Sequence, residues 1–439
     1  MTKKNDVKRR FLIALVGVLL IGLPLAAGSI PTAKPEEVGF SSDRLQRAKD
    51  AVQQHIEGRT IAGAVTLVAR RGRIAHFEAQ GFMDVETKKA MPKDGIFRLA
   101  STSKPITAVA VMMLVEEGKI RLNDPVSRFI PEFKNLNKVA VPKPGAPATP
   151  AGRGAGPGGQ STGDVTFDVV SASREITIRD LLTHTSGLVS GGLGASVAAK
   201  LAPRAPTDTL ATYIPKLAAV PLDFQPGTLW RYSGQAGFDV LSRIVEVVSG
   251  QPFDQFLKVR LFDPLGMKDT GFAATGDRAA RLATVYRRTP NGLERSDNPN
   301  ALSSATYFSG AGGLLSTAED YLQFAQMLVN GGQLNGKRLL SPRTVELLAA
   351  NHTGDMVNGQ FGRPPRGMGF GLGVQVVQDA VAADLRQSAG TFGWAGAYGT
   401  NVNMDPKEQM VTVVFIQNQG GSGPLHRDFE NAVMQAIVE

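Results

Sequence analysis

The sequence predicts an α/β protein of the α+β type, with a mixed, mostly antiparallel sheet flanked by helices and a helical lobe. Three observations predict this fold class. Strand-like segments lie near both ends of the 439-residue chain, helical patterns dominate between them, and a very short turn joins the first two strands. One sheet built from both ends accounts for the pattern. The expected sheet lobe is 36–100 with 335–439, and the expected helical lobe is 101–334.

The first elements are predicted from periodicity. Apolar residues recur at helical spacing over 42–56 and predict a helix with Ser42 as its N-cap. Residues 62–69 and 73–80 follow, rich in β-branched and alternating residues. Because only Arg71-Gly72 separates them, they form an antiparallel hairpin.

A second helix is predicted to begin close to Ser101 and to end before Gly118. Its apolar residues form one buried stripe: Ile106, Val109, Ala110, Met113 and Leu114. Pro105 is compatible with this helix only in the first turn, where its missing N–H would have no partner. This limit places the start of the helix beside Ser101.

The rest of the chain changes character twice. Helical patterns extend from about 178 to about 330. Residues 370–378, 400–405 and 410–417 are then strand-like, and a closing amphipathic helix is expected over about 427–438. These strands complete the expected sheet.

The stretch 141–163 is rich in Pro, Gly and Ala. This composition does not support a packed core, so a flexible insert is expected there.

Composition excludes several classes of protein. The chain is 42% hydrophobic and 20% charged, with a mean hydropathy of −0.07, which excludes a disordered chain and a polytopic membrane protein. It has no cysteine, so disulfides, thiolate metal sites and a cysteine nucleophile are excluded. The five histidines show no metal-binding spacing. No metal and no cofactor are therefore expected.

The first 28 residues have the order of a secretory signal peptide: a basic segment, an apolar run and small residues. An uncleaved anchor in the inner membrane is the alternative. Either form predicts export, to the periplasm or outside the cell, with any membrane contact made through this leader. The leader carries +4 of the net charge of +9, and the +5 that remains indicates no nucleic-acid partner.

The main chemical signal is Ser101-Thr102-Ser103-Lys104. Residues three apart share a helix face, so Lys104 can direct its amine at the Ser101 hydroxyl. A neighbouring amine can take the proton of a serine, provided that the amine is neutral. Lysine normally titrates near 10.4, so desolvation or a nearby cation must favour the neutral form.

Other segments accompany this motif in a definite order. They are Phe97-Arg98-Leu99-Ala100, Leu122-Asn123-Asp124-Pro125-Val126, residues 176–187, Tyr232-Ser233, residues 262–267 and Gly393-Trp394-Ala395-Gly396-Ala397. From about residue 36 onward the sequence resembles the serine β-lactamase-like hydrolases, which include class C β-lactamases, D-alanyl-D-alanine carboxypeptidases and family VIII carboxylesterases. The resemblance implies a β-lactamase/transpeptidase-like fold, with the active site between the sheet and the helical lobe.

The resemblance also implies a role for each matched position. Ser101 would be the acyl-accepting nucleophile and Lys104 its partner in proton transfer. Tyr232 matches the tyrosine of the family's Tyr-x-Asn element, whose phenol moves protons during acylation and deacylation. The backbone N–H groups of Ser101 and Ala397 would form the oxyanion hole, whose donors typically contribute about 10²–10³ in rate each.

Two departures from the family pattern bear on the substrate. Gly234 replaces the Asn of Tyr-x-Asn, which helps to hold a β-lactam side chain. Trp394-Ala395-Gly396, the implied substrate-binding element, has Trp where lactamases and peptidases have a Lys that pairs with the substrate carboxylate. Loss of a charge-assisted hydrogen bond costs about 1.5–3 kcal/mol, and an aromatic ring offers apolar surface instead. These departures favour neutral esters.

Two rival signals are set aside. Gly159-Gln160-Ser161-Thr162-Gly163 matches the Gly-x-Ser-x-Gly pattern, but it lies in the Pro/Gly-rich stretch without the strand and helix that this motif needs. His184 is predicted to be structural, at a helix end, because the family uses no histidine triad.

The sequence therefore predicts an exported serine hydrolase, a carboxylesterase acting on a small ester or amide through an acyl-enzyme. A β-lactamase, a D-alanyl-D-alanine carboxypeptidase or a transacylase would use the same chemistry on other substrates. A catalytically silent cell-envelope binding protein is the alternative of another class. The sequence leaves the oligomeric state open.

Overall fold

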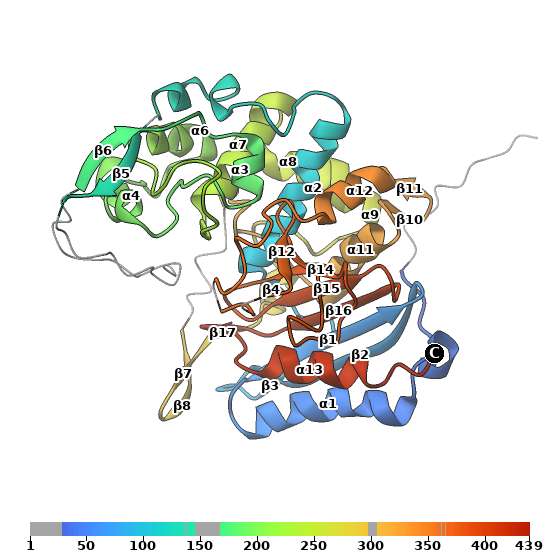
Figure 1. Cartoon of the computed structure of the whole chain (residues 1–439). Coiled ribbons are helices and arrows are strands. Elements are labelled where there is room, and N and C mark those ends of the chain that lie inside the picture. The colour runs from blue at the N-terminus through green and yellow to red at the C-terminus, as the bar shows by residue number, and fades with distance from the viewer. Residues whose placement is uncertain (1–28, 137, 145–166, 297–304, 361, 365) are drawn as a thin grey trace, which may run out of the picture.

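The predicted N-terminal hairpin forms two interior strands of a large sheet in the computed structural model of the chain (Figure 1). The structure describes residues 29–136, 138–144, 167–296, 305–360, 362–364 and 366–439. Arg71 and Gly72 both have positive φ, +52° and +72°, as a two-residue hairpin turn of type I′ requires. This turn joins β1 (Gly63–Arg70) to β2 (Arg73–Asp84) as expected.

The main sheet has eight strands, and its centre joins the two ends of the chain. In spatial order they are β12 (Met368–Phe370), β13 (Gln375–Val377), β14 (Phe392–Ala395), β15 (Asn401–Asp405), β16 (Met410–Phe415), β1, β2 and β3 (Lys89–Ala90). Every neighbouring pair is antiparallel. The C-terminal and N-terminal strands meet where β16 pairs with β1, with Leu67 opposite Val413. The mixed character that was expected lies outside this sheet, where β17 (Asn418–Gln419) runs parallel to β7 (Tyr286–Thr289).

Short strand pairs complete the β structure. They are β4 (Phe97–Arg98) with β9 (Leu315–Ser316), β5 (Lys138–Pro142) with β6 (Phe167–Ser171), β7 with β8 (Gly292–Arg295), and β10 (Gln333–Leu334) with β11 (Lys337–Arg338). The β5–β6 pair shows that Val141 and Pro142 belong to a strand, so the expected insert does not begin at 141. Its residues 145–163, and the leader 1–28, lie outside the described residues.

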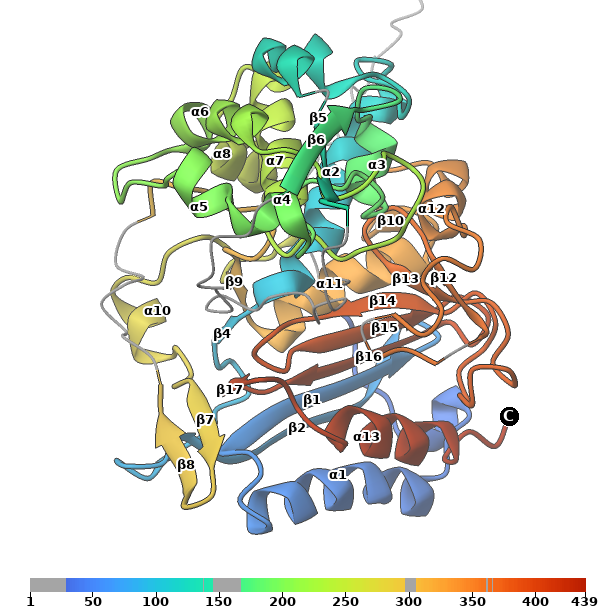
Figure 2. The same cartoon turned by 60° about the vertical axis from the view of Figure 1, so that its left-hand side comes forward.

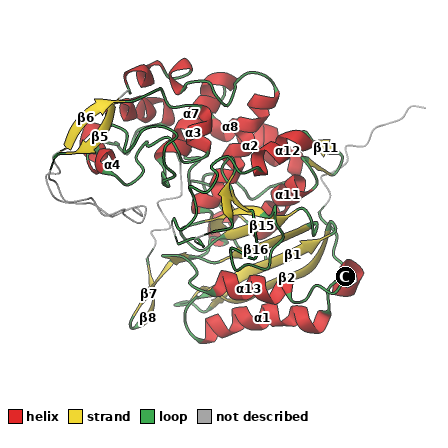
Figure 3. Cartoon of the chain, viewed as in Figure 1, coloured by secondary structure: helices red, strands yellow, loops and turns green. Residues whose placement is uncertain are grey.

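Helices cover both faces of the sheet (Figures 2 and 3). α1 (Ser42–Glu57) and α13 (Leu425–Met434) pack side by side on one face, over an apolar cluster that includes Phe40, Val68 and Phe429. α1 is capped by Ser41, whose Oγ accepts from Arg44 N, and not by Ser42 as expected. The reason is the backbone: Ser41 is extended, as a cap must be, and its N–H is bound to Ala436 O.

Two further expectations near the C-terminus are wrong in detail. Residues 370–378 are not one strand, because Gly371–Val374 form a turn closed by Gly371 N and Val374 O at 2.8 Å, with Gly373 at φ +81°. The closing helix α13 ends at Met434 and not near 438. Ile437 forms a β-bridge with Phe40 instead, which ties the chain end to the start of the domain.

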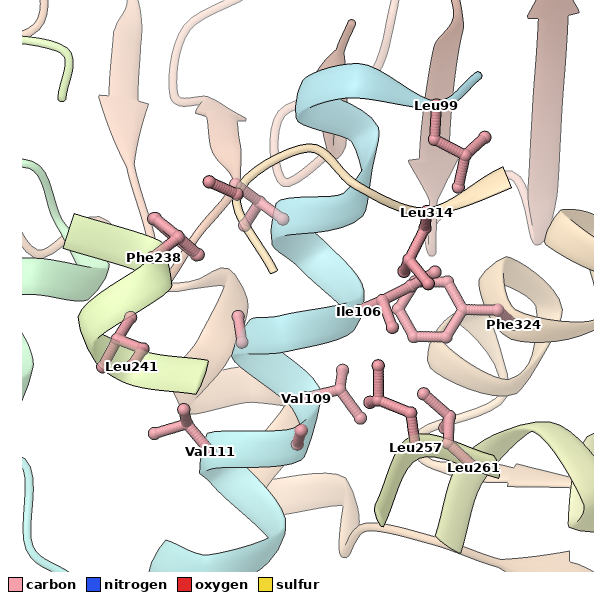
Figure 4. Close-up of a cluster of buried hydrophobic side chains, with 14 of the residues drawn as sticks. Leu99, Ile106, Val109, Val111, Phe238, Leu241, Leu257, Leu261, Leu314 and Phe324 are labelled. Atoms are coloured by element: carbon pink, nitrogen blue, oxygen red, sulfur yellow. The ribbon is translucent and has the colours of Figure 1, made fainter. Parts of the chain in front are cut away.

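The helix that begins beside Ser101 runs through the middle of the molecule. It is α2 (Ser103–Glu116), preceded by a 3-10 turn, η2 (Ala100–Thr102). The expected apolar stripe is too narrow a description, because every residue from Ser103 to Leu114 is buried. Figure 4 shows why: Phe238 and Leu241 lie on one side of this helix, and Leu257, Leu261 and Phe324 on the other. A helix buried all round can be apolar all round.

The remaining helices lie between β3 and β12 in the sequence, except one short turn before α1 that packs against α1 and β2. They are α3 (Ile178–Leu182), α4 (Leu193–Ser196), α5 (Ala198–Leu201), α6 (Leu210–Tyr213), α7 (Ala236–Ser249), α8 (Phe253–Leu257), α9 (Asp263–Leu265), α10 (Asp277–Ala280), α11 (Ala318–Val329) and α12 (Pro342–Ala349), with the short helical turns η1 (Pro35–Val38), η3 (Val126–Arg128), η4 (Pro131–Asn135), η5 (Ile214–Ala219) and η6 (Lys258–Phe262). Within the described ranges, no helix combines the length and apolarity needed to cross a bilayer.

The lobes do not divide at 334–335 as expected. α11, assigned to the helical lobe, packs on β15, β16 and β1. α12, assigned to the sheet lobe, contacts α2. Periodicity identifies the apolar face of a helix, but both lobes offer an apolar surface on which that face can pack.

Candidate active site

The strained turn before α2 places Ser101. Ala100 has φ +47°, a left-handed conformation that residues with a Cβ rarely adopt. Its neighbours hold it there: Thr102 Oγ1 donates to Leu99 O at 2.6 Å, and Tyr321 Oη donates to Thr102 O at 2.8 Å. Ser101, half-buried, is therefore presented at the start of the central helix. Strain of this kind is common at functional sites.

Lys104 has the geometry that the motif predicts. Its side chain is fully buried, and Nζ donates to Ser101 Oγ at 3.2 Å. Nζ also donates to Gly234 O at 2.7 Å and to Ala311 O at 2.8 Å. The three acceptors come from three separate segments of the chain, so tertiary packing fixes the direction of the amine.

Tyr232 completes the contacts of the serine. Its Oη donates to Ser101 Oγ at 2.7 Å, and Lys104 Nζ lies 5.0 Å from the centre of its ring. The serine oxygen is therefore within hydrogen-bonding distance of both the amine and the phenol. The structure brings Ser101, Lys104 and Tyr232 together as expected, although Tyr232 lies 131 positions from Ser101.

His184 supports Tyr232 from behind. It is buried, follows α3 and has φ +58°. Its Nδ1 accepts from Ser233 N at 3.3 Å, its carbonyl accepts from Arg231 N at 3.1 Å, and its ring lies 4.6 Å from that of Tyr232. Burial lowers the pKa of His184 well below its usual value, so the ring is neutral. These contacts agree with the structural role predicted for His184.

The third motif closes the site from the sheet. Gly396, just after β14, must be a glycine: a Cβ there would lie 2.2 Å from Leu99 O and from Thr400 Oγ1. This close approach sets the end of β14 against the turn that carries Ser101. Ala395 and Ala397 on either side of Gly396 are exposed. The two predicted oxyanion residues, Ser101 and Ala397, therefore lie on adjoining segments.

Trp394 is buried beside the phenol. Its Nε1 donates to Tyr232 Oη at 3.4 Å, and the two rings lie 5.4 Å apart. Trp230 and Phe370 pack in the same aromatic cluster. The indole therefore contacts the Tyr232 phenol and adds aromatic surface to this side of the site.

Sequence reasoning missed Asp239, a buried carboxylate on α7. It accepts from Ser309 Oγ at 2.6 Å, from Ala311 N at 3.2 Å and from Tyr307 Oη at 2.9 Å. Burial raises the pKa of Asp239, and these hydrogen bonds oppose the rise. Since Ala311 O accepts from Lys104, Asp239 fixes the segment that orients the amine. The sequence shows only that Asp239 lies within a helical pattern. Many acidic residues do the same, so this does not identify Asp239 as part of the site.

Sequence reasoning also missed Arg363, on the loop before β12. Its guanidinium carbon lies 4.5 Å from the centre of the Trp394 ring and 5.3 Å from that of Trp230. One arginine in a Gly- and Pro-rich loop gives no sign of such a position.

The fold and this site define a class: serine hydrolases built on the β-lactamase fold. The model of the Beta-lactamase family matches residues 48–435, and the chain belongs to this family. It is similar to Protein Rv1367c of Mycobacterium tuberculosis (35% identical, over 84% of this chain and 88% of the relative). It is also similar to Esterase EstB of Burkholderia gladioli (31%, over 93% and 99%).

A solved structure shows the same fold along nearly the whole chain. It is EstCE1, described as a hydrolase with promiscuous acyltransferase activity, at 30% identity and a TM-score of 0.74 over 89% of this chain and 99% of that one. Together these relatives identify the protein as a hydrolase of this family.

Proposed function

We propose that this protein is an exported carboxylesterase that forms an acyl-enzyme on Ser101. One observation carries the proposal: Ser101 Oγ lies 3.2 Å from Lys104 Nζ and 2.7 Å from Tyr232 Oη. Two groups that can accept or return a proton thus face one hydroxyl, which is what an activated serine needs.

The proposed reaction has two halves. Ser101 Oγ attacks the ester carbonyl carbon, and its proton passes to the Tyr232–Lys104 pair. The N–H groups of Ser101 and Ala397 stabilise the oxyanion, and the leaving alcohol takes the proton as the acyl-enzyme forms. Water then attacks the acyl carbonyl and gives a proton to the same pair. The acid departs, and Ser101 recovers its proton.

The surroundings of the site favour an ester over a β-lactam. Trp394 stands where the peptidases and lactamases have a carboxylate-binding lysine, and it is packed among aromatic rings. A Cβ at Gly234 would meet nothing within 4 Å, so packing does not require the glycine that replaces the Asn of Tyr-x-Asn. The similarity to Esterase EstB, named above, supports the same choice.

Acyl transfer to another alcohol is a second candidate, favoured by the likeness to EstCE1 and its promiscuous acyltransferase activity. It would differ only in the nucleophile that attacks the acyl-enzyme. A silent binding protein is disfavoured, because binding alone does not require the Ser101–Lys104–Tyr232 contacts. Export rests on the leader, and a fusion of residues 1–28 to a reporter would test it by localisation.

The test compares Ser101→Ala with Ser161→Ala, the serine of the rejected Gly-x-Ser-x-Gly match. Ser101→Ala should lose hydrolysis of a short-chain p-nitrophenyl ester and labelling by a fluorophosphonate, and Ser161→Ala should keep both. Ester hydrolysis retained in Ser101→Ala would overturn the mechanism. The wild type should also hydrolyse this ester faster than a chromogenic cephalosporin. The reverse order would assign a β-lactamase, and a product that grows with added alcohol would reveal the transferase.

A further inference from the structure

A half-buried cation lies behind the tryptophan of the third motif. The Arg363 guanidinium carbon is 4.5 Å from the centre of the Trp394 ring, within the range of a cation–π contact, and 5.3 Å from that of Trp230. Its loop is anchored at both sides: Gly359 N donates to Pro364 O at 2.9 Å, and Met368 N donates to Asn358 Oδ1 at 2.9 Å. The arginine is therefore held against the aromatic cluster.

Trp394 connects this cation to the phenol. The Arg363 guanidinium lies over the indole ring of Trp394, and the indole Nε1 donates a hydrogen bond to Tyr232 Oη at 3.4 Å. A cation over the ring withdraws electron density and makes the N–H a better donor. Arg363 contacts Trp394, Trp394 contacts Tyr232, and the phenol oxygen of Tyr232 lies 2.7 Å from Ser101 Oγ.

The charge of Arg363 persists at neutral pH and acts on the phenol. Burial lowers the pKa of Arg363 to about 10, and its interaction with Tyr232 opposes that change. Among the described residues, Lys104 on α2 and the neutral His184 after α3 also lie against the Tyr232 ring. Asp239 on α7 lies behind Lys104 and acts on that lysine. Arg363 therefore contributes positive charge to the surroundings of the phenol, and charges interact strongly where water is excluded.

We propose that Arg363 is a positioning residue for the reaction: it holds the Trp394 indole N–H toward Tyr232 and favours the ionised phenol that takes the serine proton. The sequence lacks a cation at 394, and Arg363 supplies one behind the tryptophan that replaces it. This inference rests on the proposed function, because the role given to Arg363 is to assist the proton transfer from Ser101 in the proposed reaction.

The test is the pH dependence of kcat/KM for a short-chain p-nitrophenyl ester between about pH 5 and pH 9. Arg363→Met keeps an apolar contact with the tryptophans. In this variant the acid limb of the profile, where kcat/KM falls as pH decreases, should move to higher pH by about one unit. Activity near neutral pH should then fall about tenfold and recover in alkali. Arg363→Lys, which restores a charge, should return the limb toward the wild-type pH.

Two controls separate the possible outcomes. Arg260→Met removes an arginine that also faces an aromatic ring, at 5.4 Å from Phe256, but in the helical lobe, and it should leave the limb unmoved. Arg363→Gln serves if Arg363→Met does not fold. An unmoved limb in the folded Arg363 variants, or an equal loss of activity at every pH, would overturn this inference. Activity retained in Ser101→Ala would instead overturn the proposed function.

Discussion

Lys104 is the residue that joins local and tertiary structure in this site. It is among the largest fully buried side chains of the described residues, and its amine has three acceptors. One of them, Ser101 Oγ, is one helical turn away and follows from the backbone alone. The carbonyls of Gly234 and Ala311 come from distant segments. The motif therefore identifies the pair, and the packing around it aims the amine.

At the same scale, Tyr232→Phe should lower kcat/KM by about 10²–10⁴, the usual contribution of a proton-transfer group. The variant loses only the oxygen that contacts Ser101, so the ring should still pack against His184 and Trp394. Steady-state kinetics, with the melting temperature as a check on folding, would measure this. Tyr213→Phe, on the helical lobe, is the matched control. If Tyr232→Phe kept more than half of the wild-type activity, the phenol would not be a proton-transfer group in the reaction.

At the scale of elements, the site is a junction between α2 and β14. The turn before α2 holds Ala100 at positive φ, and the end of β14 approaches it at Gly396. A helix start and a strand end meet here with backbone against backbone. This contact brings the proposed nucleophile Ser101 and the candidate oxyanion donor at Ala397 together.

Gly396→Ala should disrupt that junction. The added methyl would lie 2.2 Å from Leu99 O and Thr400 Oγ1, so the end of β14 must move. Overpacking of this kind costs about 1–3 kcal/mol of stability, and kcat should fall more than KM rises because the oxyanion site is displaced. Gly271→Ala, whose methyl would be 3.6 Å from its nearest neighbour, is the control. Wild-type kcat in Gly396→Ala would refute the close approach.

At the scale of the whole molecule, the central sheet is completed only when β16 pairs with β1. α1 and α13, from opposite ends of the chain, then cover one face together. His76 on β2 lies beneath this layer, bonded to Thr66 Oγ1 at 2.8 Å and 5.8 Å from the Phe429 ring. The layer that closes the fold therefore encloses a titratable group.

This group should make the protein sensitive to acid. Burial lowers the pKa of His76 from 6.5 to about 4. The unfolded chain takes up a proton below about pH 6.5, whereas the folded protein does not until about pH 4, so the free energy of unfolding falls as pH drops through this window. With allowance for partial exposure, the loss at pH 4.5 is about 2 kcal/mol. Urea titrations at pH 7.5 and 4.5 should show it in the wild type and a smaller loss in His76→Gln; equal losses would contradict it.

The sequence by itself determined the local features. A two-residue turn required the β1–β2 hairpin, the Pro105 limit placed the start of the central helix, and the spacing of Ser101 and Lys104 put them on one face. The family resemblance added Tyr232, which no local pattern reveals. These predictions succeeded because helix and turn geometry repeat within a few residues.

Only the tertiary structure decided the rest: that α11 packs on the sheet, that Ala100 is strained, and that Asp239 and Arg363 support Lys104 and Trp394. The physical reason is the same in each case. A helix pattern shows which face is apolar but not which surface covers it, and a charged residue shows no partner until distant segments meet. Long-range packing therefore sets the direction, burial and electrostatic surroundings of the groups that the motifs supply.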